Sequence, residues 1–306
     1  MNDQEFHDVK QANDDFYEII GNGLISEFIP YLRLFYLTRE LRWKQLNKMR
    51  LNILEKNFKE HEKTYQNGII RSFADSLMSS QEEAVKNDSN YAKYYNFDNL
   101  KMVISDLFAA ANDTLQLSLR WMFLLLGNYP EIQDRILSEI HNSIGDRMPV
   151  QSDKSLCPYT WAFVLETLRY RAPGPFGLDR CTSTDTELMG YKLKKNERVF
   201  FNLHQQNHDP KYWKEPEQFR PERFLNPNTG QLITGQIKSF VTFSLGKRIC
   251  VGERLAITIL FLLIINLVKK IKFELPDGPG SAQLQAVNIL IGSLPKNYQI
   301  KLTKRN

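Results

Sequence analysis

The feature that most constrains the fold of this chain is the segment FSLGKRICVG at residues 243–252, which leads directly into the most apolar stretch, residues 255–268. That stretch is interrupted by polar residues and is shorter than the roughly 18 apolar residues needed to cross a bilayer. It therefore predicts a long buried helix over residues 251–269. The chain must build a core around one helix that has a thiol, Cys250, at its start.

The surroundings of Cys250 favour a thiolate. Gly246 and Gly252 flank the thiol, and Lys247 and Arg248 add positive charge to the same loop. Backbone N–H groups at a helix start and nearby cations both stabilise a thiolate. Cys250 is thus placed to act as a metal ligand or a nucleophile. The alternative is a small buried cysteine, which is the commoner state of a lone thiol.

Other chemistries for Cys250 find less support. A cysteine nucleophile needs a histidine base, and the sequence places none of its five histidines beside Cys250, so this chemistry stays open without support. His204 and His208 have a ligand-like spacing, but no HExxH motif or cysteine pair accompanies them, which argues against zinc. The C-x-x-C-H motif of covalently attached haem is absent. The other cysteines, Cys157 and Cys181, show no paired spacing, which favours a reducing compartment.

The composition is that of a globular protein with a sizeable core. Of the 306 residues, 42% are hydrophobic and 25% are charged, which excludes disorder as the main description. The formal net charge of +5 suits an acidic partner or an anionic cofactor and is too small to indicate nucleic-acid binding. The N-terminus, MNDQEFH, has neither a basic start nor an apolar run, so we expect no signal peptide, anchor or transmembrane segment in this sequence.

The periodicity of apolar residues, together with the prolines and glycines that end each periodic segment, predicts a mainly α fold with a small β region. Both are expected to share one hydrophobic core. Helices are expected from Asn13 to about Phe73, with a break at Pro30. The polar segment Ser79–Asn99 is expected to be an exposed connection. The other predicted elements are helices over residues 97–127, 130–144, 159–170 and 251–269, short strands at 187–188 and 198–200, and a strand-like tail at 298–300.

The segment 243–252 fits the pattern F-x-x-G-x-R-x-C-x-G and resembles the haem-binding signature of cytochrome P450, the haem-thiolate monooxygenases. Three further motifs of that family occur in the expected chain order. They are AANDT at 110–114, similar to the A/G-G-x-D/E-T motif, ETLR at 166–169, similar to E-x-x-R, and FRPERF at 219–224, similar to P-E-R-F. Each is weak alone, and their joint occurrence makes the resemblance specific. The segment HDPKYW at 208–213 is similar to the family-2-like microsomal branch.

The resemblance implies that Glu166, Arg169 and Arg223 form a buried triad, a structural lock for the loop before Cys250. An acid and a base three residues apart lie on one helix face, where an exposed pair contributes only a few tenths of a kcal/mol. In the family the second arginine completes a buried network, a role that suits the planar arginine fork. Breaking such a network leaves an uncompensated buried charge.

The same resemblance makes Cys250 the axial ligand of the iron, with Phe243, Gly246 and Gly252 as cofactor-binding positions of the loop. It implies that Asp113 and Thr114 deliver protons to iron-bound oxygen, because that task needs a titratable group beside a hydroxyl. Thr114 is expected to bond back to the carbonyl of Ala110, opening a groove at the cofactor. The family usually has Gly where this chain has Ala111, and the added methyl narrows that groove.

A haem propionate needs a cationic partner, and the resemblance offers Arg180 first and Arg248 second for this role. Either residue could instead be a plain surface arginine. The expected substrate pocket draws on Phe108, Ala110, Pro175, Phe176, Leu290 and Leu294.

By this resemblance the protein is a monooxygenase that inserts one oxygen atom from dioxygen (O2) into an apolar small molecule, with haem b (heme) as cofactor. Electrons are expected from NADPH through a flavin enzyme, NADPH-cytochrome P450 reductase, docking near Lys247 and Arg254. No nucleic-acid partner is expected. Full-length relatives are expected at the endoplasmic reticulum membrane, held by an N-terminal anchor that this sequence lacks.

Residues 1–306 are expected to form a partial cytochrome P450 domain, similar to the C-terminal two-thirds of the fold, without the anchor and first helices. Within it, residues 1–170 are expected to be helical, and residues 159–306 to hold the E-x-x-R helix, the β region and the haem loop. One alternative is a truncated, catalytically impaired haem-binding remnant or interaction module. Another is a haem-thiolate isomerase that needs no reductase.

Overall fold

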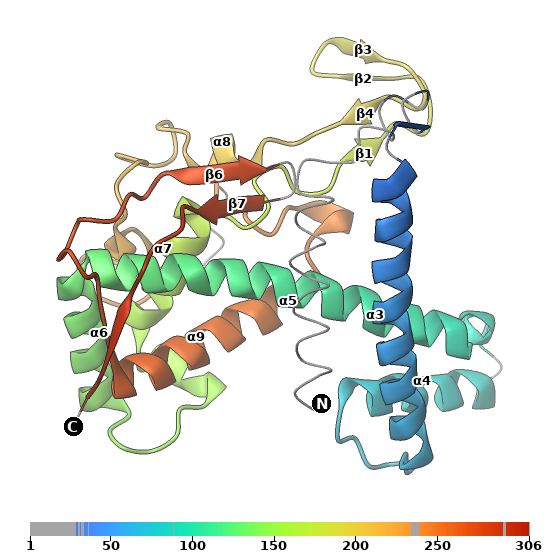
Figure 1. The fold of residues 1–306 in the computed structure, drawn as a ribbon, viewed down its shortest axis with the longest axis horizontal. Helices are drawn as coiled ribbons and strands as arrows, with labels where there is room; N and C mark the ends of the chain where they lie inside the picture. Colours follow the sequence, from blue (N-terminus) through green and yellow to red (C-terminus); the bar gives the residue numbers. More distant parts are fainter. Residues whose placement is uncertain are drawn as a thin grey trace. The chain divides into compact units, whose positions relative to one another are not determined.

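The computed structural model describes residues 29, 31, 34, 35, 37–87, 89–233, 239–289 and 292–305. Its α-helices are α3 (Leu37–Lys63), α4 (Phe73–Lys86), α5 (Phe97–Asn128), α6 (Pro130–Ser143), α7 (Pro158–Tyr170), α8 (Leu203–Asn207) and α9 (Glu253–Lys270) (Figure 1). Its 3-10 turns are η2 (Ala92–Tyr94), η3 (Gln151–Ser155), η4 (Pro221–Phe224) and η5 (Gly246–Arg248). The chain divides into two compact units, Met1–Asp113 and Thr114–Asn306, and α5 runs through the division.

The strands of the described residues form small antiparallel pairs. They are β1 (Arg180–Cys181) with β4 (Arg198–Val199), β2 (Thr186–Leu188) with β3 (Tyr191–Leu193), β5 (Ile271–Glu274) with β8 (Lys301–Lys304), and β6 (Ala286–Ile289) with β7 (Gly292–Pro295). The predicted fold class, mainly α with a small β region, is confirmed. In the part of the chain that the structure describes, no helix is long and apolar enough to cross a membrane.

Two predicted segments differ from the structure. The segment Ser79–Asn99 is not one exposed connection, because α4 continues to Lys86 and α5 begins at Phe97. The helix forms because its apolar face, at Met78, packs with Phe58 and Leu100, a long-range contact that the polar composition does not reveal.

The C-terminal strand is β8 at Lys301–Lys304, not residues 298–300. Tyr298 is instead held by its hydroxyl, which donates to the carbonyl of Arg120 at 2.6 Å. The strand therefore begins only after this anchoring residue. Of the predicted N-terminal helices, residues 13–28 and the break at Pro30 lie outside the described residues.

The first unit contains a small apolar cluster of Phe58, Met78 and Leu100. The partly buried Phe97 packs against it, edge-on to Phe58, with ring centroids 5.3 Å apart. Helix α4 begins at a Ser72 cap, where the hydroxyl accepts from the N–H of Asp75 at 3.2 Å. The Asp75 carboxylate is completely buried and accepts from the Arg71 guanidinium at 2.9 and 3.0 Å. This guanidinium holds the pKa of Asp75 far below its usual range.

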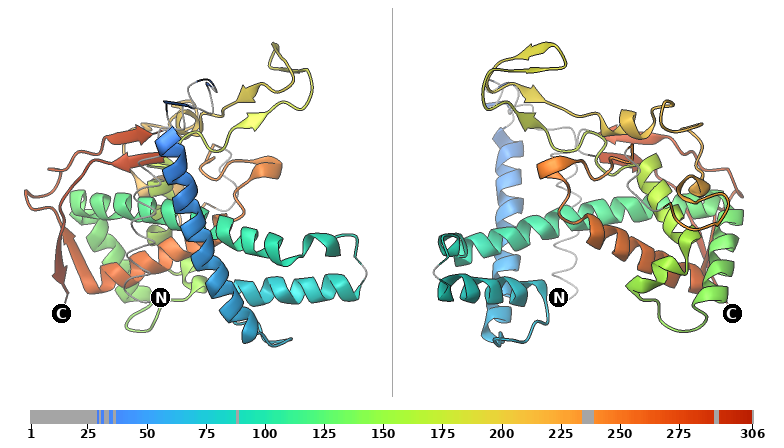
Figure 2. Two further views of the ribbon diagram at one scale, coloured as in Figure 1. Left: turned by 45° about the vertical axis from the view of Figure 1, so that its right-hand side comes forward. Right: turned by 180° about the vertical axis from the view of Figure 1, so that it is seen from behind.

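The second unit has its main core where α6, α7 and α9 pack against one another (Figures 1 and 2). The apolar residues predicted as a buried helix are indeed in α9, where Phe261, Ile264 and Ile265 are fully buried. Helix α7 starts against α6, because the Glu139 carboxylate accepts the backbone N–H groups of Tyr159 and Thr160, both at 2.8 Å. These bonds satisfy donors that a helix start leaves free, and they fix the helix that carries the E-x-x-R motif.

Candidate functional site

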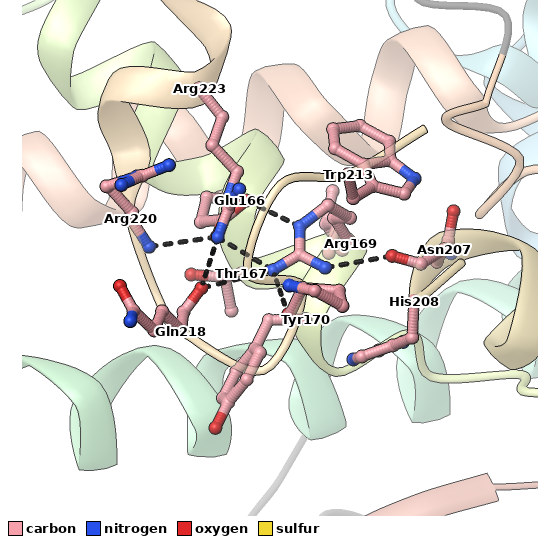
Figure 3. Close-up of polar contacts among 12 residues, drawn as sticks. Glu166, Thr167, Arg169, Tyr170, Asn207, His208, Trp213, Gln218, Arg220 and Arg223 are labelled. Carbon is pink, nitrogen blue, oxygen red and sulfur yellow. Dashed lines mark hydrogen bonds and ion pairs between the residues drawn. The ribbon is translucent and has the colours of Figure 1, made fainter. Parts of the chain in front are cut away.

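The centre of the candidate site is an ion pair on α7 between Glu166 and Arg169, both of which are completely buried. The i,i+3 spacing puts the two side chains on one helix face, as the sequence predicts. Arg169 Nε donates to Glu166 Oε2 at 2.7 Å, and Arg169 Nη2 donates to Oε1 at 2.9 Å (Figure 3). The bidentate geometry and the burial make this a structural pair and exclude a solvated one.

Arg223 joins this pair from η4, as predicted for the third member of the triad. Its Nε donates to Glu166 Oε1 at 3.2 Å, and the backbone N–H of Arg220 donates to the same oxygen at 2.9 Å. The guanidinium of Arg223 also donates to the carbonyls of Lys214, Glu215 and Gln218. Burial lowers the pKa of Arg223, while the charge of Glu166 opposes that shift. The structure therefore brings Glu166, Arg169 and Arg223 together.

The remaining donors of Arg169 bind backbone carbonyls of two other segments. Nη1 donates to the carbonyl of Asn207 at 2.8 Å, and Nη2 donates to that of Pro216 at 2.9 Å. The guanidinium carbon lies 5.3 Å from the centre of the Trp213 ring. Arg169 thus ties α7 to the end of α8 and to the loop before η4 (Figure 3).

Sequence reasoning missed Asn207 and Thr242, which extend this network toward Cys250. Asn207 is completely buried, and its side chain bonds to Val241 and Thr242, at the start of the segment that ends at the cysteine. No motif marks either residue. The one indication in the sequence is the chemistry of the asparagine itself. If its amide is buried, both its N–H donors and its carbonyl acceptor need hydrogen-bond partners.

The loop around Cys250 turns sharply before α9 begins. Ser244 and Gly246 have left-handed backbones, with φ of 63° and 72°, and the second position suits the predicted glycine. The N–H of Cys250 donates to the carbonyl of Phe243 at 2.9 Å, closing the loop. Gly252 is the cap residue of α9. An added Cβ at Gly252 would lie 3.9 Å from Cys250 Sγ, so contact with the sulfur does not by itself require glycine there.

The Cys250 thiol is exposed and has apolar neighbours that are exposed as well. In the isolated chain Val251 is 86% exposed and Leu255 is 62% exposed, and Leu245 and Ile249 are also open to solvent. The alternative of a small buried cysteine therefore does not hold for Cys250. It does describe Cys157, which is fully buried. An exposed thiol just before a helix, with exposed apolar side chains next to it in the sequence, suits a flat apolar group that binds through sulfur.

Comparison with known proteins settles what kind of protein has this loop. The family model "Cytochrome P450" matches residues 1–302. The chain belongs to the cytochrome P450 family. It is 35% identical to "Cytochrome P450 1A1" of Opsanus tau over 277 residues, which cover 90% of this chain and 53% of that protein.

Other curated relatives give the same result. The chain is 35% identical to "Cytochrome P450 1A1" of Dicentrarchus labrax over 280 residues, or 91% of this chain and 54% of that protein. It is 35% identical to "Cytochrome P450 1A5" of Gallus gallus over 277 residues, or 90% of this chain and 52% of that protein. The chain therefore spans about half the length of the curated relatives it matches. Membership of the family implies haem iron with a thiolate ligand.

The donor set in this cytochrome P450 chain fits haem. Among the described residues, no group of three or more His, Cys, Asp or Glu side chains is arranged to hold a metal ion. The exposed Cys250 offers a sulfur that could bind haem iron as a thiolate. The exposed apolar residues next to it in the sequence are side chains of the kind that a bound macrocycle would cover.

Arg180 lies beside the cysteine loop of this cytochrome P450. Its Nη2 donates to Ser244 Oγ at 3.4 Å, and its guanidinium carbon is 5.8 Å from the centre of the Phe201 ring. Arg248 lies in η5 and is exposed. Both arginines are therefore near or within the loop, and their proposed contact with a propionate stays a prediction.

Ala110, Asp113 and Thr114 lie in the middle of α5, on a helix that runs unbroken through them. Asp113 is half-buried, and Ala110 and Thr114 are exposed. The carbonyl of Thr114 accepts from Ser118 Oγ at 2.8 Å. The expected bond from Thr114 back to Ala110, and the approach of these residues to the iron, stay predictions.

A cavity of about 260 Å³ lies behind the cysteine loop, between α7 and α9. Its lining is mostly apolar and includes Trp161, Phe243 and Ile249. None of the residues predicted for the substrate pocket lines this cavity. Of those residues, Leu294 packs on the Trp121 cluster, Pro175 is buried, and Leu290 lies outside the described residues.

Proposed function

We propose that this chain is the haem-binding part of a monooxygenase that inserts one oxygen atom from dioxygen into an apolar small molecule. The observation that carries the proposal is the exposed Cys250, at the start of α9, in a loop that follows the buried Glu166–Arg169–Arg223 network. When bound, haem supplies the iron chemistry that activates dioxygen. The other residues proposed to hold it are Phe243, Gly246, Gly252, Arg180, Arg248 and Ala110.

In this proposal Cys250 binds the iron as a thiolate and donates electron density to it. The positive end of the α9 dipole favours the anionic sulfur. The exposed neighbours Val251 and Leu255 exclude water from the sulfur once they are covered. Arg180 and Arg248 hold propionates by charge-assisted hydrogen bonds, for which the guanidinium geometry is suited.

Asp113 and Thr114 are proposed to move protons toward the distal side of the cofactor. A half-buried carboxyl next to an exposed hydroxyl is the arrangement that such a transfer needs, because one group titrates and the other passes a proton on. Ala111 adds a methyl beside them and narrows the space available.

Electrons are proposed to come from NADPH through a flavin reductase that docks near Lys247 and Arg254. Both side chains are exposed, and the net charge of +5 suits an acidic partner. An apolar substrate is proposed to contact Phe176, which is half-buried. For the complete protein, we propose a place at the endoplasmic reticulum membrane.

The absorption spectrum of the reduced protein under carbon monoxide tests the proposal. The chain reconstituted with haem should show the red-shifted band of a thiolate ligand. Cys250→Ala should abolish that band, whereas Cys157→Ala and Cys181→Ala, the matched controls, should keep it. A normal band in Cys250→Ala would refute the assignment. A wild-type chain that takes up no haem would favour the interaction-module alternative.

A further inference from the structure

Asn207 occupies the junction between the buried ion pair and the cysteine loop. It is the last residue of α8 and is completely buried. Its main-chain carbonyl accepts from Arg169 Nη1 at 2.8 Å. Its side chain is then free to bind a different segment, and that segment is the irregular stretch at residues 241–242 that precedes the cysteine loop.

Both ends of the Asn207 amide are bonded. Oδ1 accepts the backbone N–H of Val241 at 3.1 Å, and Nδ2 donates to Thr242 Oγ1 at 3.0 Å. The hydroxyl of Thr242 in turn donates to the carbonyl of Leu168 on α7, also at 3.0 Å. The segment at residues 241–242 is therefore fixed at two points to helices α7 and α8.

The orientation of this amide is determined by its partners. If the amide were reversed, Nδ2 would face the N–H of Val241, and two donors would oppose each other. Oδ1 would then face the oxygen of the Thr242 hydroxyl, whose hydrogen is already donated to the carbonyl of Leu168. Two acceptors would therefore oppose each other. A buried donor without an acceptor is costly, so only the observed orientation satisfies the network.

The series of hydrogen bonds that begins at Arg169 continues to Cys250. Val241 and Thr242 directly precede Phe243, whose carbonyl accepts the N–H of Cys250 at 2.9 Å. A displacement of the 241–242 segment would shift that carbonyl, and with it the backbone of Cys250. Arg169 and Cys250 are thus connected through Asn207 by hydrogen bonds and one short stretch of backbone, residues 241–243.

We propose that Asn207 is a positioning residue that fixes the backbone of the Cys250 loop to the Glu166–Arg169 pair. It acts through Val241 and Thr242 and does not touch the reacting atoms. Its effect on haem ligation rests on the function proposed above, whereas its effect on the loop backbone does not.

Hydrogen–deuterium exchange of the full chain without haem tests the backbone effect. Asn207→Ala should accelerate exchange of the Val241 and Cys250 amides by about tenfold or more, because it removes buried hydrogen bonds. Exchange within α9, at residues 257–268, should stay unchanged. Asn202→Ala is the matched control, since it removes the cap of the same helix, where Oδ1 accepts from Gln205 N at 2.9 Å, and it should leave the loop amides protected.

Thr242 provides a second test if Asn207→Ala does not fold. Thr242→Val keeps the side-chain shape and removes the hydroxyl, so it should accelerate exchange in the loop as Asn207→Ala does. Thr242→Ser keeps the hydroxyl and should restore protection. Unchanged loop exchange in these variants, or an equal acceleration throughout α9, would overturn the proposal.

The reduced carbon monoxide spectrum tests the effect on ligation. Asn207→Ala should lower the fraction of thiolate-ligated haem several-fold, whereas Asn202→Ala should not. If the wild-type chain shows no thiolate band, the proposed function fails, and the exchange experiment still decides the role of Asn207. If the wild type shows the band and Asn207→Ala matches it in both spectrum and exchange, the role of Asn207 is refuted and the function stands.

Discussion

Glu166 and Arg169 face each other on one turn of α7 with Nε and Oε2 2.7 Å apart, and neither side chain has any solvent exposure. Burial removes the hydration of both charges, so each depends on its protein partners. The Glu166 carboxylate accepts from Arg169, from Arg223 and from the N–H of Arg220. This complete set of partners explains how a charged pair is kept in the core next to the cysteine loop.

Removal of one partner should therefore be costly. We expect Arg169→Ala to lower the free energy of unfolding by about 3–5 kcal/mol, because it leaves the Glu166 charge buried without compensation. Arg220→Ala is the control, since its side chain pairs with Glu215 at 3.2 Å on the surface and should contribute no more than about 1 kcal/mol. Urea denaturation measures both. Equal losses in the two variants would contradict a structural role of the buried pair.

The three cysteines should differ in reactivity. Burial, and next to it the charge of Glu139, raises the pKa of the Cys157 thiol to about 12, whereas Cys181 and Cys250 are exposed. Because the thiolate is the reactive form, we expect iodoacetamide at pH 8 to modify Cys181 and Cys250 in the native haem-free chain and to spare Cys157. Peptide mass spectrometry reads the sites. Modification of Cys157 at the rate of Cys181 would show that its surroundings are open.

Stability should fall in acid through His208. Burial, and next to it the charge of His204, lowers the pKa of His208 to about 4, and its Nε2 has no hydrogen-bond partner among the described residues. In the unfolded chain a histidine titrates near 6.5. The unfolded state therefore binds the proton first as the pH falls, and stability is lost between about pH 6.5 and pH 4, by an amount on the order of 3 kcal/mol.

The variant His208→Gln should flatten this part of the stability curve. His141→Gln is the control, because His141 is exposed on α6 and its replacement should leave the curve unchanged. Denaturation at several pH values gives the comparison. A wild-type curve with no slope between pH 6.5 and pH 4 would show that His208 becomes protonated in the folded state without cost.

Thr114 should affect how much product the enzyme forms for each oxygen molecule that it consumes. In the complete enzyme assembled with the proposed reductase, we expect Thr114→Ala to lower the product formed per oxygen consumed several-fold, because proton delivery is then impaired and peroxide is released. Ser138→Ala is the control, since its hydroxyl bonds only its own helix, at the carbonyl of Asp134. An unchanged ratio in Thr114→Ala would mean that Thr114 is an ordinary helix residue.

The sequence by itself determined the features that depend on near neighbours. The helices predicted at residues 130–144 and 159–170 follow from apolar periodicity and an initial proline, and the structure confirms both, at Pro130–Ser143 and Pro158–Tyr170. The Glu166–Arg169 pair was predictable because its members lie three residues apart on one helix. The position of Cys250 just before a long buried helix likewise follows from a glycine-rich loop next to a long apolar run, whereas the exposure of its thiol is seen only in the structure.

Only the tertiary structure decided which distant groups meet. Asn207 and Val241 are 34 residues apart, and their bond exists because α8 ends where the loop segment has an unpaired N–H. Helix α4 continues through a polar sequence because Met78 packs in one cluster with Phe58 and Leu100. Sequence patterns record the periodicity of a single element, whereas such contacts depend on which buried groups other segments leave without partners.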